Sequence, residues 1–399
     1  MATFVSATLI AVAILLAIPA AVIFSEVVAA ILPWRAQAYS LKRDREQQVA
    51  VIIPAHDEGT NLLPTIEDIK GQVRSHDRIL VVADNCSDNT ADIAGGAGVE
   101  VTRRNDATKI GKGYALDFGL KHLASNPPGI VVIIDADCRA PEGTIDRLAA
   151  ACAMSRRPVQ APYLLNAPPD SGISYRVAEF ALRLKNWLRP LGLNALNLPC
   201  QLMGTGMAFP WDVIRRADLA SGSIVEDLKL GLDLARLGSA PLFCVTAAVS
   251  SNFPFSESGA KTQRERWEAG HVRLILAEGP RLILSALMRR NLGLLALTLD
   301  LAVPPLSLYV SLLGAMIVIT AAATYFGASA AALITSIASL LLLTMAVLLA
   351  WLKCGRDILP ASALTLIATF LLGKLPLYFR LLRNRAASQW VRTDRQKLD

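Results

Sequence analysis

The chain has 399 residues, 53% of them hydrophobic, and a formal net charge of +7. This length suits one large catalytic domain plus membrane segments, and the apolar content is too high for an ordinary soluble protein of this size. A nucleic-acid-binding role is disfavoured, because the basic residues flank long apolar segments instead of forming a basic domain.

The cysteines and histidines form no disulfide or metal pattern. Six cysteines are scattered without a C-x-x-C pair, and four histidines show no ligand spacing. We therefore expect reduced thiols facing the cytosol and the core, without a zinc site.

The first apolar segment, residues 1–25, has no charged side chain and is long enough to cross a bilayer once. It lacks the basic start of a cleaved signal peptide, so we expect a retained anchor over residues 1–34. Four basic residues follow this anchor: Arg35, Lys42, Arg43 and Arg45. By the positive-inside rule they place the next domain in the cytoplasm, and we expect them to contact anionic lipid head groups.

From about residue 48 the pattern changes to short apolar runs that alternate with helix-like stretches. The expected strands are residues 49–54, 78–83, 99–102 and 130–134. The expected helices are residues 61–72, a short helix opened by residues 87–90, and residues 113–123. This alternation predicts a parallel α/β sheet with helices on both faces, within a cytosolic domain of residues 48–275.

Polar clusters follow three of these strands at the point where each strand ends. The clusters are Pro54 with His56-Asp57-Glu58, Asp84 with Asn85, and Asp135-Ala136-Asp137. Ligands of parallel sheets bind at the carboxyl ends of the strands, so we expect these clusters to meet at one site. The alternative interpretation is that each cluster is only a loop or a helix cap.

Asp135 and Asp137 are the candidate ligands of a divalent cation. In an extended Asp-x-Asp the two side chains share a face, and their hard oxygens can grip one ion directly or through water. Lys112, between Gly111 and Gly113, is a candidate for contact with a phosphate or a base, although no P-loop pattern is present.

Two stretches of the predicted cytosolic domain, residues 171–200 and 203–207, can each be interpreted in two ways. Residues 171–200 mix large apolar residues with basic ones, which suits a helix touching the membrane surface or a long acceptor, or else an ordinary surface helix. Residues 203–207 are glycine-rich around Gly204 and Thr205. If the chain is a group-transfer enzyme, these small residues could let the acceptor substrate approach the backbone. The alternative is a simple turn.

Glu226 and Asp227 precede a helix-like stretch over residues 228–237. An enzyme that transfers a group to a hydroxyl of its acceptor substrate needs a base to take the hydroxyl proton. Asp227 is the candidate for this role. The alternative interpretation is a carboxylate that merely complements the dipole at a helix N-terminus.

Gln263, Arg264, Arg266 and Trp267 form the most specific motif. On a helix, Gln263, Arg266 and Trp267 share a face, because they lie at i, i+3 and i+4. A guanidinium can hold a phosphate oxygen bidentately, and an indole can stack on the face of a sugar. The alternative is an amphipathic helix at the membrane interface.

Three segments follow the cytosolic domain: an interfacial amphipathic segment, a C-terminal membrane region and a basic cytosolic tail, over residues 276–299, 300–382 and 383–399. Residues 301–352 carry no charge and can cross a bilayer twice, with a turn near residues 325–327. Residues 358–382 are expected to be re-entrant or to lie at the interface, with a further span as the alternative.

In their order along the chain, these motifs resemble those of the family-2 glycosyltransferases. The likeness is to the membrane-embedded branch, which includes cellulose, chitin, hyaluronan and poly-N-acetylglucosamine synthases and ceramide glucosyltransferases. The matching pieces are residues 51–58, residues 81–85, Asp135-Ala136-Asp137, Glu226-Asp227 and Gln263-x-x-Arg266-Trp267. Residues 389–395 also look like a tail seen in bacterial members.

The resemblance implies a GT-A fold and a metal-dependent, inverting transfer of a hexose that leaves a β linkage. It implies Mg²⁺ or Mn²⁺ held by Asp137 with Asp135, uridine near Asp57 and Asp84, and Asp227 as the base. The other expected nucleotide-binding residues are Pro54, His56, Glu58, Lys112, Asp135 and Ala136. The expected acceptor and diphosphate side consists of Gly204, Thr205, Glu226, Gln263, Arg264, Arg266 and Trp267.

We therefore interpret the chain as a multi-pass enzyme of the bacterial inner membrane with its catalytic domain in the cytoplasm. We expect it to move one sugar from a UDP-sugar to a lipid-linked or membrane-bound acceptor in exopolysaccharide or glycolipid synthesis, alongside other polysaccharide-assembly proteins. The alternative is a processive synthase that extends and exports a β-linked polymer. A transporter or membrane scaffold with a degenerate cytosolic domain predicts damaged carboxylate motifs, whereas Asp135, Asp137 and Asp227 are all present. These three carboxylates are expected to border one cavity.

Overall fold

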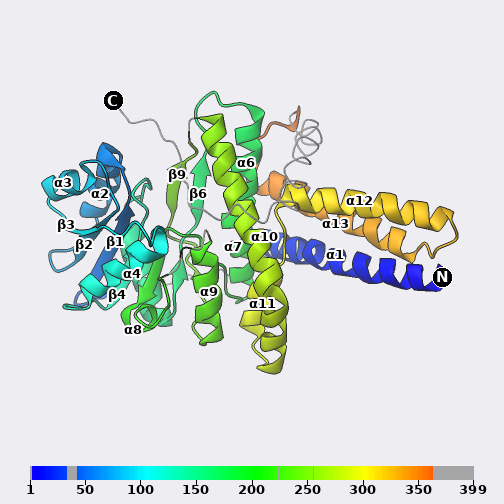
Figure 1. Cartoon of the computed structure of the whole chain (residues 1–399), viewed down its shortest axis with the longest axis horizontal. Coiled ribbons are helices and arrows are strands. Elements are labelled where there is room, and N and C mark those ends of the chain that lie inside the picture. The colour runs from blue at the N-terminus through cyan, green and yellow to red at the C-terminus, as the bar shows by residue number, and fades with distance from the viewer. Residues whose placement is uncertain (1, 34–42, 221, 223–224, 255, 363–399) are drawn as a thin grey trace. The chain divides into compact units, whose positions relative to one another are not determined.

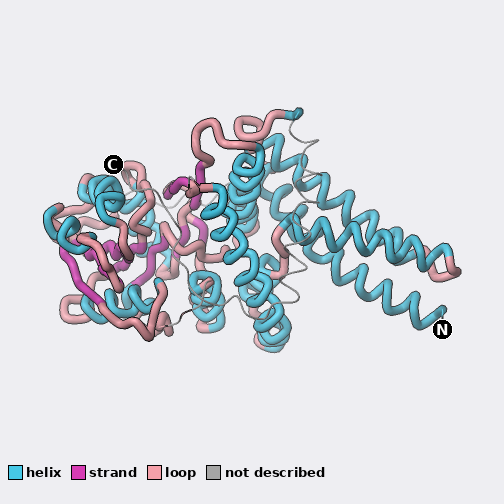
Figure 2. Tube along the Cα trace, turned by 45° about the horizontal axis from the view of Figure 1, so that its top comes forward, coloured by secondary structure: helices cyan, strands magenta, loops and turns pink. Residues whose placement is uncertain are grey.

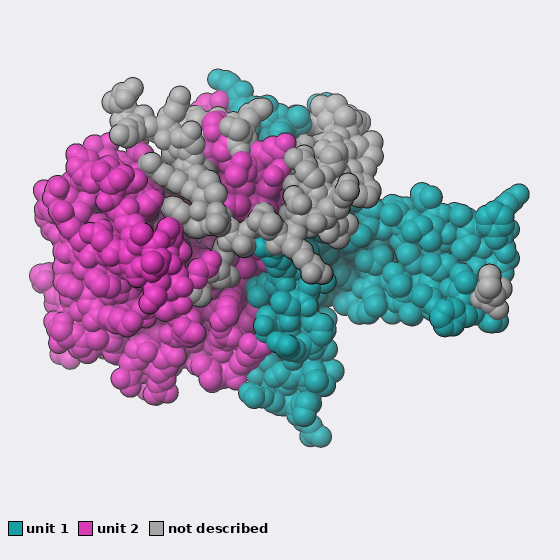
Figure 3. Space-filling view, viewed as in Figure 1, with its two compact units in different colours: residues 1–34, 170–196, 271–387 teal, residues 35–169, 197–270, 388–399 magenta. Residues whose placement is uncertain are grey.

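A computed structural model of the chain describes residues 2–33, 43–220, 222, 225–254 and 256–362. The chain divides into two compact units, which Figure 3 shows in two colours. The helical unit consists of residues 1–34, 170–196 and 271–387, and the α/β unit of residues 35–169, 197–270 and 388–399. Residues 170–196, expected within the cytosolic domain, thus group with the apolar helices.

The α/β unit is built on a seven-stranded sheet with the strand order β3-β2-β1-β4-β7-β5-β8 (Figure 1). Its strands are β1 (Val49–Ala55), β2 (Arg78–Asp84), β3 (Glu100–Arg104), β4 (Ile130–Ile133), β5 (Val159–Gln160), β7 (Met207–Pro210) and β8 (Leu242–Phe243). The first four pair in parallel, and β7 runs antiparallel to both of its neighbours. A separate parallel pair joins β6 (Tyr163–Asn166) to β9 (Val249–Asn252).

Helices cover both faces of the seven-stranded sheet. The helical elements of this unit are η1 (Gly59–Leu62), α2 (Leu63–Lys70), α3 (Thr90–Gly96), α4 (Lys112–Leu123), α5 (Thr144–Ser155), α8 (Trp211–Ile214) and α9 (Glu226–Arg236). Alternate residues of β1 point to opposite faces, so Val51 and Ile53 pack with α2 and α5, whereas Ile52 packs with α4 and α9. A central strand buried on both faces explains why this stretch of sequence is apolar without alternation.

The expected elements of residues 48–134 are all present, with ends shifted by one or two residues. The first expected helix starts as the 3₁₀ turn η1 and becomes α-helical where Pro64 occupies its first turn, a position that needs no N–H donor. The parallel strand pairing and the two-sided cover confirm the predicted α/β sheet. The short strands β5, β7 and β8 lie beyond the elements that we predicted.

The helical unit contains α1 (Ala2–Ile31), α6 (Ile173–Arg183), the π-helix η2 (Leu184–Leu188), α7 (Arg189–Ala195), α11 (Leu292–Leu301), α12 (Leu306–Tyr325) and α13 (Ala331–Cys354). The long helix α10 (Glu257–Met288) begins in the α/β unit and ends in the helical unit. Among the residues that the structure describes, three helices are long and apolar enough to cross a membrane, over Thr3–Ile31, Leu306–Tyr325 and Ala331–Cys354. The expected turn between the last two is present, and Gly327 supplies its left-handed conformation with φ of 91°.

Within the helical unit, α1, α12 and α13 run alongside one another, and α11 crosses α1 (Figures 1 and 2). The segment α6–η2–α7 packs onto these apolar helices, because Phe180, Leu184 and Leu188 share one core cluster with Ile23 and Val27 of α1. The segment α6–η2–α7 is therefore not an ordinary surface helix, whereas its contact with the membrane surface or with a long acceptor stays a prediction. One face of this segment is buried against α1.

The structure corrects one expectation about the basic residues that follow α1. The Arg43 side chain is fully buried in an ion pair with Asp77, at 2.7 Å, and it does not face lipid. In the sequence, an arginine next to a predicted membrane segment suggests a lipid contact. Its actual partner, Asp77, lies 34 residues later in the chain. Arg35 and Lys42, most of residues 358–382 and the basic tail 383–399 lie outside the described residues.

Candidate active site

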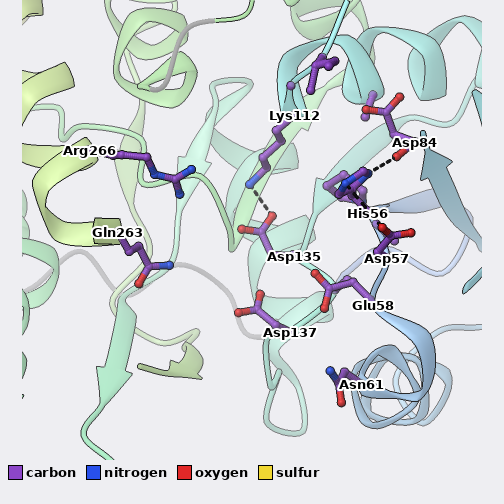
Figure 4. A pocket seen from close by; sticks show the side chains of 16 residues that line it. His56, Asp57, Glu58, Asn61, Asp84, Lys112, Asp135, Asp137, Gln263 and Arg266 are labelled. Atoms are coloured by element: carbon purple, nitrogen blue, oxygen red, sulfur yellow. Dashed lines mark hydrogen bonds and ion pairs between the residues drawn. The ribbon is translucent and has the colours of Figure 1, made fainter. Parts of the chain in front are cut away.

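A pocket in the α/β unit lies at the carboxyl ends of β1, β2 and β4 (Figure 4). Because β1 pairs in parallel with β2 on one side and β4 on the other, the polar residues that follow these strands meet at one edge. The predicted residues that line the pocket are Pro54, His56, Asp57, Glu58, Asp84, Lys112, Asp135, Ala136, Asp137, Gln263 and Arg266. Its other lining residues, which we did not predict, are Ala55, Asn61, Ile110, Gly111 and Ala115.

The loop after β1 is tied to the loop after β2. His56 Nδ1 donates to the Asp84 backbone oxygen at 2.7 Å. Asp57 has a left-handed backbone with φ of 52°, and its carboxylate accepts from the Ser87 amide at 2.6 Å, the Ser87 hydroxyl at 3.0 Å and the Asp88 amide at 3.2 Å. Partial burial opposes these bonds, but together the bonds lower the pKa of Asp57. Asp57 thus stays ionised and fixes the wall of the pocket.

Asp84 at the end of β2 is buried and paired with Arg104. Arg104 Nη1 donates to Asp84 Oδ1 at 2.5 Å, and the guanidinium lies 5.5 Å from the ring centre of Tyr114. Burial raises the pKa of Asp84, and Arg104 partly offsets that rise. Arg104 was not among the predicted residues, because nothing local marks it as the partner of a residue 20 positions earlier.

Asp135 and Asp137 form a candidate site for a divalent cation. Ligand atoms of Asp135, Asp137 and Cys138 all lie within 4.8 Å of one another. Burial, and then the charges of the two aspartates, raise the pKa of the Cys138 thiol, so this thiol stays protonated. The carboxylate oxygens are therefore the charged ligand atoms of the group. Ser251 Oγ on β9 donates to Asp137 Oδ2 at 2.8 Å and orients that carboxylate. Hard oxygen donors suit Mg²⁺ or Mn²⁺, so the acidic pair can hold the expected ion.

A second close group consists of Asp57, Cys86 and Asp88. Its carboxylates are already occupied by the protein, because Asp57 accepts from the Ser87–Asp88 loop and Asp88 Oδ1 accepts from the Thr90 amide and hydroxyl. This group fits a structural turn better than a cation site.

Lys112 lies at the first position of α4 and reaches across to the acidic pair. Its Nζ donates to Asp135 and, at 2.7 Å, to the Gly204 backbone oxygen. Burial lowers the pKa of Lys112, but the charges of Asp135, Glu226 and Asp227 outweigh this and raise it. The ammonium therefore stays charged, bonded to Asp135 and Gly204 and attracted by the two carboxylates at the start of α9.

Asp227 lies beside the pocket without lining it. α9 starts at Glu226, two residues before the predicted helix, so Glu226 and Asp227 form its first turn, and Asp227 Oδ1 accepts from the Leu228 amide at 2.8 Å. A methyl group on Gly204 would lie 3.4 Å from Asp227 Oδ2 and 3.5 Å from Lys112 Nζ, which places Asp227 next to the lysine that holds Asp135. Burial, and then the Asp227 carboxylate, raise the pKa of Glu226 to about 8.

The glycine-rich segment supports the pocket from behind. Gly204 and Gly206 have φ of 89° and 66°, and Thr205 between them is fully buried. Thr205 Oγ1 accepts from the Asp135 amide at 3.0 Å, and Gly206 donates its amide to the Ile133 oxygen at 2.9 Å. Thr205 therefore holds the backbone of Asp135 and does not face a ligand.

The helix α10 contributes two residues of its predicted motif to the pocket. Gln263 is 7% exposed, and its Oε1 has no hydrogen-bond partner among the residues that the structure describes. Figure 4 shows Gln263 and Arg266 on the side of the pocket that faces Asp135 and Asp137. Burial lowers the pKa of Arg266, and Glu226 opposes that shift. Arg264 and Trp267 lie on the same helix but are not among the lining residues.

Comparison with known proteins adds a family and a fold. Residues 46–270, more than half of the chain, match the sequence model of the glycosyltransferase like family 2. No curated protein matches the chain. Among solved structures, it is similar to a mannosyltransferase from Pyrobaculum calidifontis in complex with GDP-Man and Mn²⁺, with 18% identity and a TM-score of 0.53 over 88% of this chain and 99% of that chain. This likeness shows the predicted GT-A fold.

Two other solved structures are similar over a smaller share of the chain. One is GalNAc-T7 with UDP, GalNAc and Mn²⁺, at 14% identity and a TM-score of 0.40 over 58% of this chain and 51% of that chain. The other is a glucosyl-3-phosphoglycerate synthase from Mycobacterium tuberculosis in complex with Mn²⁺, UDP and glucosyl-3-phosphoglycerate. Its identity is 20% and its TM-score 0.35, over 56% of this chain and 80% of that chain.

Proposed function

The chain belongs to the glycosyltransferase like family 2, and we propose that it transfers a sugar from a UDP-sugar to a lipid-linked or membrane-bound acceptor. The observation that carries this proposal is the single pocket that joins three strand-end acidic clusters to Gln263 and Arg266 of α10. Such a pocket offers one end to a nucleoside, a centre to a cation and a diphosphate, and a far side to an acceptor.

The donor side of the proposal uses the loops after β1 and β2. Asp84 and the loop around Asp57 would accept hydrogen bonds from the base and ribose, with Pro54, His56 and Glu58 completing the wall. Asp137 with Asp135 would hold Mg²⁺ or Mn²⁺, and the ion would neutralise charge on the leaving diphosphate. Lys112, held in place by Asp135, adds a fixed positive charge beside the same group.

The acceptor side of the proposal uses α9 and α10. Asp227 would take the proton of the acceptor hydroxyl, and the inverted product would carry a β linkage. Gln263 and Arg266 would hold the donor: the half-buried guanidinium of Arg266 can donate to the diphosphate, and the buried Gln263 Oε1 can accept from a substrate hydroxyl. Trp267 would contact the acceptor, and Glu226 and Arg264 would support the two helices at this end.

The helical unit supports a membrane-bound acceptor. The second half of α10 exposes large apolar side chains on one face: Leu276, Leu284, Leu287 and Met288. Arg281, Arg289 and Arg290 lie along or just after the same stretch, and an apolar face with arginines suits a helix at the surface of an anionic bilayer. We propose a multi-pass protein of the bacterial inner membrane, with the α/β unit in the cytoplasm where nucleotide sugars are made.

The test is a donor screen on the full-length protein in lipid nanodiscs. UDP-sugars and GDP-sugars are supplied with Mn²⁺ or Mg²⁺, and the readouts are nucleoside diphosphate release and product mass. We expect cation-dependent release of UDP from one UDP-sugar. Release from GDP-sugars alone would overturn the UDP assignment, and no release from any donor would overturn the transfer reaction itself.

A processive synthase is the second candidate, and the observation that favours it is the Gln263-x-x-Arg266-Trp267 motif on α10. The same screen separates the two candidates by product mass. A single added hexose supports transfer to a lipid acceptor, whereas a ladder of masses spaced by one hexose supports polymer synthesis.

A further inference from the structure

A cluster of buried charges in the helical unit lies outside the candidate active site. Glu26 of α1, Arg189 of α7 and Asp300 of α11 are 2%, 7% and 9% exposed. Arg189 Nε donates to Glu26 Oε2 at 2.6 Å. Arg189 Nη2 donates to the Asp300 carboxylate and, at 3.2 Å, to the Asp300 backbone oxygen. One guanidinium thus joins three helices.

Close backbone contact fixes two of these helices beside the cluster. A methyl group on Gly192 of α7 would lie 1.9 Å from the Glu26 backbone oxygen, so a larger residue cannot occupy this position without a shift. The charged groups therefore meet at a junction where the helices have little freedom to slide past one another.

The cluster is connected to α10 by a hydrogen bond between His271 of α10 and Leu301, the residue after Asp300. His271 is buried, and its Nε2 lies 2.9 Å from the Leu301 backbone oxygen. Burial, and then the charges of Lys185 and Arg189, lower the pKa of His271 to about 3, so its imidazole is neutral. Since a carbonyl oxygen can only accept, Nε2 carries the proton and donates it to Leu301.

Two simpler roles do not account for the cluster. Side chains this buried cannot touch a sugar nucleotide or an acceptor, so any influence on the reaction must pass through the helices that they join. A purely stabilising role is also a poor explanation, because apolar residues of similar size often stabilise a core as well as a buried ion triad does. The triad instead favours one arrangement of α1, α7 and α11, because sliding any one of these helices would leave a charge buried without its partner.

The helix α10 connects this junction to the pocket. It is one uninterrupted helix from Glu257 to Met288, and Gln263 and Arg266 in its first half line the pocket. His271 follows Arg266 by little more than one helical turn. Because the three residues lie on one helix, fixing the turn that carries His271 also limits how the turns with Gln263 and Arg266 can rotate or shift along the helix axis.

We propose that Arg189 is a positioning residue of the transfer reaction. With Glu26 and Asp300 it holds α11, and through the His271 hydrogen bond it holds α10 in the register that presents Gln263 and Arg266 to the donor. The first span is then part of the catalytic apparatus as well as an anchor. The activity readouts of this inference rest on the proposed function, whereas its structural readout does not.

The first test is Arg189→Lys in the full-length protein in nanodiscs. A lysine keeps the charge but cannot bridge Glu26, Asp300 and the backbone oxygen with one planar group. We expect kcat for transfer to fall about tenfold, because a small misplacement of groups that hold the diphosphate costs at least this much. The donor KM should stay within about threefold. The matched control is Arg183→Lys, which alters an arginine of α6 paired with Asp357, at 2.6 Å, and should leave both constants unchanged.

A double-mutant cycle shows whether Arg189 acts through α10. If Arg189→Lys misplaces Arg266, then Arg189→Lys combined with Arg266→Lys should lose no more activity than Arg266→Lys alone. Losses that multiply independently would contradict the proposal, as would a folded Arg189→Lys variant with wild-type kcat. A merely structural residue would lower the melting temperature but leave kcat of the folded enzyme intact.

Hydrogen exchange supplies a readout that needs no activity. Arg189→Lys should speed amide exchange in peptides covering residues 257–288 relative to Arg183→Lys and wild type. Glu26→Gln, which keeps the side-chain shape, provides a second variant if Arg189→Lys does not fold, and it should produce the same pattern with a smaller change. Unchanged exchange in α10 for the folded variants would overturn the positioning role even if the donor screen fails.

Discussion

In the α/β unit, five carboxylates line a pocket together with Lys112 and Arg266, whereas in the helical unit two carboxylates share the buried guanidinium of Arg189. Both sites therefore carry more acidic than permanently basic groups. The first is open to ligands, and its excess negative charge can be met by a cation that arrives with the substrate. The second is closed, and its charges are arranged to hold helices.

This contrast separates two uses of a charged residue in an enzyme. Where the charge is reachable, as at Asp137, its removal should change chemistry or binding while the fold survives. Where the charge is enclosed, as at Arg189, its removal should first change how helices are placed. Each of the following predictions tests one side of this contrast.

The largest effect is expected for Asp227→Asn. If Asp227 is the base, transfer should fall about 10³-fold, because an amide cannot take the acceptor proton, while nucleotide affinity stays within about twofold. Transfer rates and nucleotide binding are measured on the same preparation. The control is Asp233→Asn on the same helix, whose carboxylate pairs with Lys229 and Arg236. Unchanged turnover in Asp227→Asn would remove this residue as the base.

Asp137→Ala should weaken cation-dependent nucleotide binding about 100-fold, because it removes a hard oxygen ligand. Titration calorimetry with UDP and Mn²⁺ measures this, and cation-independent binding should change little. Asp92→Ala is the control, since this exposed aspartate pairs with Arg103 on the surface. A metal titration that matches wild type would refute the assigned role of Asp137.

Gly192→Ala should destabilise the helical unit by about 2 kcal/mol, because the added methyl group would clash with the Glu26 backbone oxygen. Gly314→Ala on α12 is the matched control: apart from its chain neighbours and its own helix backbone, no described atom lies within 4 Å of the added methyl group, so the higher helix propensity of Ala should raise stability by up to about 1 kcal/mol. Thermal unfolding in the same detergent compares the two. Equal melting temperatures would show that α1 and α7 are free to separate at this point.

The smallest of these effects is expected for Trp267→Ala. This residue lies on α10 outside the pocket, so donor hydrolysis should stay near wild type while transfer to the acceptor falls about tenfold, the scale of one lost aromatic contact. The two rates are measured side by side on the same donor. Equal losses in both would mark Trp267 as a structural residue.

The centre of the site is predictable from sequence because its signals are local. Apolar strands end in polar residues, and this pattern alone places Asp84, Asp135 and Asp137 at one edge of a parallel sheet. Asn61 and Ile110 line the pocket without a local signal. Partners such as Ser251 for Asp137 arise only when β9 folds against the strand end.

Buried charge was the least predictable feature. Glu26 and Arg189 are 163 positions apart, and Arg189 and Asp300 are 111 positions apart, so no nearby residue marks any of the three as part of an ion pair. Arg43 shows the same difficulty, because in the sequence it follows a predicted membrane segment, whereas the fold buries it against Asp77. Pairing across such distances depends on tertiary packing, which no periodicity or local motif encodes.

The most direct test of the account is the position of Mn²⁺ in a crystal of the full-length protein grown with UDP and Mn²⁺. Anomalous scattering identifies the ion without relying on its expected geometry. The account predicts one ion bound by Asp137, next to Asp135 and the diphosphate. An ion bound at Asp57, Cys86 and Asp88 instead, or UDP bound away from the ends of β1, β2 and β4, would contradict it.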